Sequence, residues 1–103
     1  MKINLDQQFM DLRGNPLSHK MCDTLANALA ISSTGNPKRV MQWAHDLINN
    51  GEIEVTAADV QLLRIFIMNS RLNNLERVQL LERIAKQTQA VEEKRWRLRI
   101  ILR

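Results

Sequence analysis

The fold is decided by residues 36–69, which read NPKRVMQWAHDLINNGEIEVTAADVQLLRIFIMN. The stretch opens with Asn36, a residue type that caps helix N-termini, and Pro37, which suits the first helical position. Apolar residues then return at helical spacing, until Asn50 or Gly51 supplies a left-handed cap. The first half therefore predicts a helix that starts at Pro37 and ends just before Gly51.

The second half of this stretch predicts another helix, over residues 57–69. Thr56 suits the N-cap, and Asp59 is placed to reach back toward it, as in a capping box. In the nine residues after Asp59, only Gln61 and Arg64 are polar. A helix that is apolar nearly all round is buried on most sides, so we expect this to be the central helix.

Short extended segments are predicted on either side of the first of these helices. Residues 52–55 alternate charged and apolar side chains over only four positions, which indicates a short extended link. Ile3 and Leu5 also alternate with polar neighbours and indicate a short strand near the N-terminus. The cluster Gly14–Pro16 that follows is typical of a turn.

Two more helices complete the prediction. Ser18 suits the N-cap of a first helix, and Asn73 with Glu76 suits the start of a last one. We therefore predict a mainly α fold, a compact bundle of about four helices with a short N-terminal extended or β element. The predicted helices cover residues 18–32, 37–49, 57–69 and 74–86.

The composition is that of one small globular domain. The chain has 103 residues, of which 45% are hydrophobic and 25% are charged. Its single cysteine excludes an intrachain disulfide and a multi-cysteine zinc site. The sequence has no run of roughly 20 apolar residues and no apolar segment of the kind found in signal peptides. We therefore expect a cytoplasmic protein and no membrane partner.

The net charge of +4 is unevenly distributed. Residues 1–82 have eight basic and nine acidic side chains, whereas residues 83–103 have seven basic and two acidic ones. This asymmetry indicates an electrostatic contact with an anionic partner. We predict one domain over residues 1–90 and a basic C-terminal segment over residues 91–103, docked on the domain or arm-like. A helix is favoured for this segment, and the alternative is a strand that pairs with residues 2–6.

The basic segment contains the predicted contact residues. Trp and Arg are the residue types most enriched at interface hot spots, so an exposed Trp96 among arginines suits an acidic protein partner. The alternative within the fold is that Trp96, Leu98 and Ile100 complete the core of the domain. The predicted partner-binding residues are Lys94, Arg95, Trp96, Arg97, Arg99 and Arg103.

Nucleic acid is the alternative partner. The arginines of the basic segment can contact phosphates, and Trp96 can stack on a base. The helices predicted over residues 37–49 and 57–69 are also arranged like a helix-turn-helix. The second of them offers only Arg64 for reading bases, however, and a recognition helix needs several polar residues. The basic segment is therefore the stronger candidate for such contacts.

No group of residues meets the requirements of an active site. His19, Cys22 and Asp23 share one face of the helix predicted over residues 18–32, but a cysteine nucleophile needs an activated thiolate and an oriented base. Glu52 and Glu54 point to one side of an extended segment, toward solvent. We predict no catalytic residue, no cofactor and no metal ion, and therefore no enzyme.

Three short motifs punctuate the chain. They are D-L-x-G-N-P at residues 11–16, L-A-N-A-L at residues 25–29, and W-A-x-x-L at residues 43–47 followed by Gly51. This layout resembles a loose class of small phage-encoded helical proteins of unassigned function. The resemblance covers about residues 1–85 and implies no catalytic residue, and the basic tail from Lys94 lies outside it.

These observations together predict a small phage-type accessory protein that binds and modulates a macromolecular protein partner, for example a host factor, in the cytoplasm of a bacterial host cell. A nucleic-acid-binding regulatory protein and a virion or assembly component are the alternatives. A homo-oligomer is compatible with the sequence.

Overall fold

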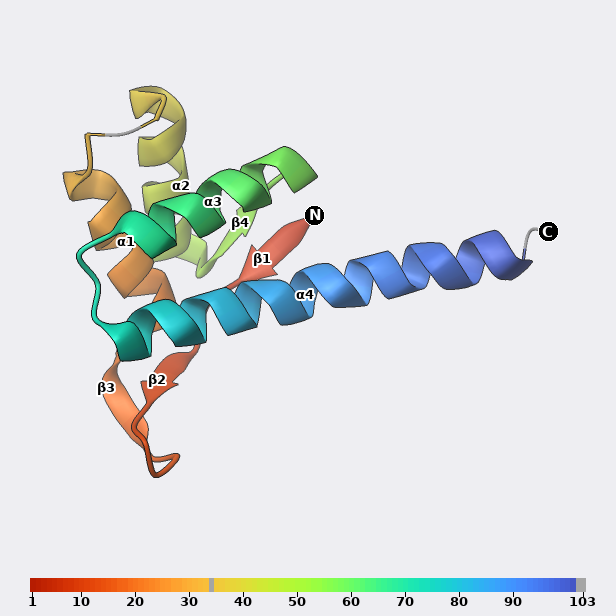
Figure 1. Cartoon of the computed structure of the whole chain (residues 1–103). Helices are drawn as coiled ribbons and strands as arrows, with labels where there is room; N and C mark the ends of the chain where they lie inside the picture. The colour runs from red at the N-terminus through yellow and green to blue at the C-terminus, as the bar shows by residue number, and fades with distance from the viewer. Residues whose placement is uncertain (34, 102–103) are drawn as a thin grey trace.

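The described part of the chain folds into four helices and four short strands (Figure 1). The computed structural model describes residues 1–33 and 35–101, and of residues 90–101 it describes the helical backbone alone. The elements in chain order are β1 (Lys2–Asn4), β2 (Gln8–Met10), β3 (Pro16–Lys20), α1 (Met21–Ile31), α2 (Pro37–Asn50), β4 (Glu52–Glu54), α3 (Ala57–Asn69) and α4 (Asn74–Ile101). The prediction of a mainly α fold with a small β element is confirmed.

The described strands form two antiparallel pairs, whereas the sequence predicts a short strand near the N-terminus and an extended link over residues 52–55 without pairing them. Strand β1 pairs with β4, with Ile3 opposite Ile53, and both of these side chains are buried in the core. The expected link over residues 52–55 is therefore half of a small sheet. The alternative that the basic segment forms a strand beside residues 2–6 is wrong, because β4 occupies that position and α4 stays helical to Ile101.

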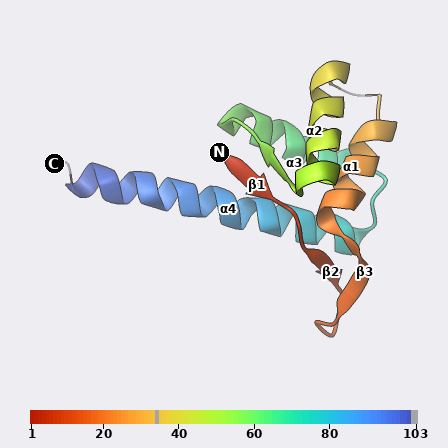
Figure 2. The ribbon, with the colours of Figure 1, turned by 180° about the vertical axis from the view of Figure 1, so that it is seen from behind.

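The second pair, β2 with β3, forms a hairpin that extends away from the helices (Figure 2). The prediction that Ser18 caps the first helix is wrong, because Ser18 lies within β3 and α1 begins at Met21. No side chain caps this helix. The amides of Met21 and Cys22 donate instead to the carbonyls of Gln7 and Leu5, at 2.8 and 2.9 Å. Backbone carbonyls of the N-terminal segment thus cap the first amides of α1.

The predicted caps of α2, α3 and α4 are confirmed, whereas the end predicted at residue 86 is wrong because α4 continues to Ile101. Asn36 Oδ1 accepts hydrogen bonds from two amides of the first turn of α2, and Gly51 ends that helix with a φ of 71°. Thr56 and Asp59 form the expected capping box at the start of α3. At the start of α4, the Glu76 amide donates to Asn73 Oδ1 at 2.8 Å.

Helix α3 differs from its prediction. Val60, Leu63 and Ile67 face the core, but the opposite side of the helix leaves Leu62 and Ile65 exposed. Helix α3 therefore lies at the surface of the body, and the expectation of a central helix buried on most sides is wrong. The helix therefore has more apolar residues than the number that it buries in the core.

Helix α4 is joined to the strands by a ridge of polar side chains. Gln87 donates to the carbonyl of Asn4 and accepts from its amide, at 2.6 and 2.7 Å. Gln79 forms the same pair of hydrogen bonds with the backbone of Met10, at 2.8 and 2.9 Å. Between them, Arg83 Nε donates to the Asn4 carbonyl at 3.0 Å. These residues are four apart, so they lie on one face of the helix.

The C-terminal part of α4 runs beyond the other elements (Figure 1). The domain boundary predicted at residue 90 falls within this continuous helix and stays a prediction.

Candidate functional site

Most of the predicted partner-binding residues lie in α4, in the part of that helix whose backbone alone is described. Lys94, Arg95, Trp96, Arg97 and Arg99 lie in this helix, but their side chains are outside the described part of the chain, and Arg103 lies outside the described residues altogether. The side chains that the structure describes are those of residues 1–33 and 35–89.

An open groove with a volume of about 920 Å³ lies between α1, α2 and α3. Its lining includes the buried side chains of Leu29, Trp43 and Leu63, which belong to the core. Two of the lining side chains, Ile31 and Leu62, are 83% and 57% exposed. Apolar surface therefore continues from the core out to solvent at this place.

Each of the three helices contributes a stripe of the same kind. The lining residues recur at positions i, i+3, i+4 and i+7, which is one face of an α-helix over two turns. The three stripes run from Thr24 to Ile31 on α1, from Asn36 to Trp43 on α2 with its N-cap, and from Leu62 to Asn69 on α3. At a rise of 1.5 Å per residue, each stripe is about 10 Å long.

Two serines end the helices that border this groove. The hydroxyl of Ser32 donates to the Leu29 carbonyl at 2.8 Å, and the hydroxyl of Ser70 donates to the Ile67 carbonyl at 2.7 Å. Each of these carbonyls also accepts the amide of the same serine, so the last helical turn is closed by the backbone and the side chain of one residue. Ile31 is the last residue of α1, and it lines the groove next to the C-cap Ser32.

The charged residues that line the groove are Arg39 and Arg71, and no carboxylate lines it among the described residues. Arg39 is held in place, because its guanidinium forms an ion pair with Asp59 and lies over the Trp43 ring, 5.2 Å from the centroid. Arg71 is exposed and forms no ion pair within the described part of the chain. The rim of the groove is therefore positive through Arg71, whose charge has no partner among the described residues.

Asp59 is buried where it meets Arg39. Burial alone raises the pKa of its carboxyl, but hydrogen bonds with Thr56 and the charge of Arg39 outweigh this effect and hold the pKa below its ordinary value. The carboxylate is therefore charged at neutral pH, and it fixes the position of Arg39 beside the groove.

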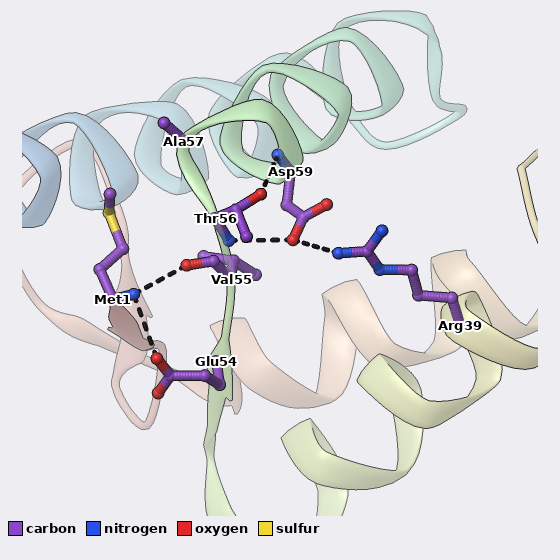
Figure 3. A pocket seen from close by; sticks show the side chains of 7 residues that line it. All are labelled: Met1, Arg39, Glu54, Val55, Thr56, Ala57 and Asp59. Atoms are coloured by element: carbon purple, nitrogen blue, oxygen red, sulfur yellow. Dashed lines mark hydrogen bonds and ion pairs between the residues drawn. The ribbon is translucent and has the colours of Figure 1, made fainter.

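A second, smaller hollow of about 390 Å³ lies around Asp59 and the N-terminus (Figure 3). Its polar groups already have partners within the chain. The Met1 amine contacts Glu54 Oε1 at 3.1 Å and the Val55 carbonyl at 2.8 Å, and the Thr56 amide donates to Asp59. These contacts join β4 to its neighbours, which is a structural role.

The grouping of His19, Cys22 and Asp23 does not form as expected. His19 lies in β3 and Cys22 in α1, so the prediction of a shared helix face is wrong. His19 Nε2 is 3.1 Å from Glu76 Oε2. Burial raises the pKa of the Cys22 thiol, and Asp23 adds to this effect, so the sulfur stays protonated at neutral pH. A nucleophilic cysteine requires the opposite.

The two glutamates of β4 form ion pairs. Glu52 is 3.8 Å from the Lys2 ammonium, and Glu54 contacts the Met1 amine, so both carboxylates lie beside positive charges of the neighbouring strand. Within residues 1–33 and 35–89, no group of three or more His, Cys, Asp or Glu side chains is placed to hold a metal ion.

Comparison with protein-family models, curated proteins and solved structures finds no match to this chain. Among the described helices, none is both long enough and apolar enough to cross a membrane. The groove is therefore the feature from which a function can be argued. Sequence reasoning missed it, because Leu62 and Ile65 were assigned to the core, and the available signal was the surplus of apolar residues over residues 57–69.

Proposed function

We propose that this is a small non-enzymatic accessory protein that binds and modulates another protein, and that the groove between α1, α2 and α3 receives an apolar segment of that partner. The phage-type layout supports a role in the cytoplasm of a bacterial host cell. One observation carries the proposal, namely an open groove whose lining extends from buried Trp43 to exposed Ile31 and Leu62. Concave apolar surface of this kind marks interaction sites in soluble proteins.

A protein partner suits this groove better than a nucleic acid. Nine of its twenty lining residues are Leu, Ile, Val, Phe or Trp, which offer nothing to a phosphate backbone. Of its two arginines, Arg39 is already paired with Asp59, which leaves Arg71 for such a contact. An apolar face of a partner can instead replace the water that covers these side chains, and the hydrophobic effect favours that exchange.

The basic segment is proposed as a second contact. Its residues Lys94, Arg95, Trp96, Arg97, Arg99 and Arg103 and its large positive charge support an acidic partner surface.

The same charge favours a second candidate function, nucleic-acid binding through residues 91–103. This candidate predicts capture that depends on intact nucleic acid and weakens steeply with salt.

Capture from bacterial lysate with matched variants tests the proposal. The groove variant carries Leu62→Ser and Ile65→Ser, whose wild-type side chains are exposed in the groove, so the fold is retained. The control carries Ile48→Ser on α2, where the side chain is 54% exposed and lies away from the groove. A tail variant carries Arg97→Gln and Arg99→Gln.

We expect one protein to be captured equally by the wild type and the Ile48→Ser control from nuclease-treated lysate, and to be lost with the groove variant. Loss of about tenfold in affinity is the size expected for truncating two central apolar contacts. Equal capture by the groove variant and the control contradicts the groove. Capture that disappears after nuclease treatment identifies the second candidate function instead.

A further inference from the structure

We propose that the segment received by the groove is an acidic amphipathic helix, whose apolar face covers the groove and whose carboxylate side chain pairs with Arg71. This inference rests on the proposed function and adds the conformation and the charge of the partner segment. It follows from two observations, the absence of any strand edge along the described groove and the sign of the charges at its rim.

The conformation follows from backbone hydrogen bonding. The described lining residues all belong to α1, α2, α3 and the connections that follow or precede them, so no strand edge offers amides and carbonyls to an extended peptide. An extended peptide in this groove would bury amides and carbonyls that no strand edge satisfies, which is costly. A helix satisfies these groups internally, and it presents the i, i+3, i+4, i+7 spacing that the three lining stripes also have.

The charge preference follows from the two arginines. The charge of Arg39 is already balanced by the buried carboxylate of Asp59. Arg71 follows Ser70, the C-cap of α3, lines the groove, and forms no hydrogen bond or ion pair in the described part of the chain. An arginine at the edge of an apolar groove favours a carboxylate on the ligand, because its planar guanidinium can bind both oxygens.

The same charges argue against the basic segment of a second copy as the occupant. Residues 91–103 carry five basic and two acidic side chains, so seating them in the groove would bring like charges to Arg71. An acidic partner instead complements both the groove rim and the basic segment.

Selection from a displayed library of random 15-residue peptides tests this inference on the full chain. Three proteins are compared, each carrying Arg95→Gln, Arg97→Gln and Arg99→Gln so that the tail does not attract acidic peptides. The first has no other change, the second adds Arg71→Glu, and the third adds Leu62→Ser and Ile65→Ser. Circular dichroism establishes that all three keep the helix content of the wild type.

We expect the first protein to enrich peptides with apolar residues at helical spacing and at least one Asp or Glu on the flank. The Arg71→Glu protein should enrich Lys or Arg at that flank, and it should bind a selected acidic peptide about tenfold more weakly. Apolar helical peptides with no charge preference, or a preference that Arg71→Glu leaves unchanged, overturn the inference alone. Peptides that the Leu62→Ser, Ile65→Ser protein enriches equally, or no enrichment at all, overturn the groove as well.

Discussion

Asp59 connects two helices through one buried carboxylate. It accepts from the Thr56 amide at the start of α3 and pairs with Arg39 in the first turns of α2. Its own amide donates to the Thr56 hydroxyl at 3.2 Å. The side chain therefore sets the N-terminus of α3 and the position of α2 relative to it, and with them the spacing of two walls of the groove.

The substitution Asp59→Asn is expected to lower the free energy of unfolding by about 1–2 kcal/mol at neutral pH, because it removes the charge that Arg39 and the Thr56 amide stabilise. The folded-state pKa lies below its ordinary value of 3.8, so this contribution is complete above that pH and is lost as the pH falls below it. Urea unfolding of both proteins between about pH 7 and pH 3 measures the difference between their free energies of unfolding. A difference that stays constant over this pH range contradicts this role of the carboxylate.

Gly51 shows how a single glycine joins two segments. Its φ of 71° suits glycine, and a Cβ built on it would lie 2.7 Å from the Cβ of Asp6. Gly14 has a similar φ of 84° but nothing within 4 Å of its Cβ position. We expect Gly14→Ala to cost about 1 kcal/mol from backbone strain, and Gly51→Ala to cost at least about 1 kcal/mol more from the close approach. Equal midpoint temperatures of thermal unfolding for the two variants would show that the close approach of Asp6 does not destabilise Gly51→Ala.

Three capping signals were predictable from the sequence, because they are local. Asn36, Gly51 and the Thr56–Asp59 pair act on amides and carbonyls within four residues, so the sequence alone identifies them. The hairpin was not predictable in this way. Ser18 is a good capping residue by type, but pairing of β3 with β2 takes it away from the helix.

The attachment of α4 to the strands was also beyond the reach of sequence patterns. Gln79 and Gln87 read as ordinary surface residues of a helix, and their partners lie 69 and 83 positions earlier in the chain. Only the folded arrangement brings these side chains to the exposed backbone of β1 and β2.

Gln87→Ala is expected to lower the free energy of unfolding by about 2 kcal/mol, since two hydrogen bonds to the Asn4 backbone are lost. Gln89→Ala is the matched control, because it makes the same change of helix propensity at an exposed position. Urea unfolding should place the control close to the wild type. Equal free energies of unfolding for the two variants would show that the hydrogen bonds of Gln87 do not hold α4 to the strands.

At the scale of the whole molecule, the groove exists because three helices meet with their apolar stripes only partly covered. No single stretch of the sequence predicts the groove, because Ile31, Trp43 and Leu62 each suit a core position when they are considered separately. The sequence predicted the elements and the uneven charge, whereas the concave surface depends on how α1, α2 and α3 are arranged. Both the positive rim and the basic segment favour an acidic protein partner.

The most direct test of a protein-binding groove is amide hydrogen–deuterium exchange of the full chain, alone and bound to the captured partner. We predict that binding slows exchange in peptides from residues 24–33, 35–43 and 62–72, which contain the groove lining, and leaves the β2–β3 hairpin unchanged. Protection confined to residues 91–103, or spread evenly over the chain, would contradict the account.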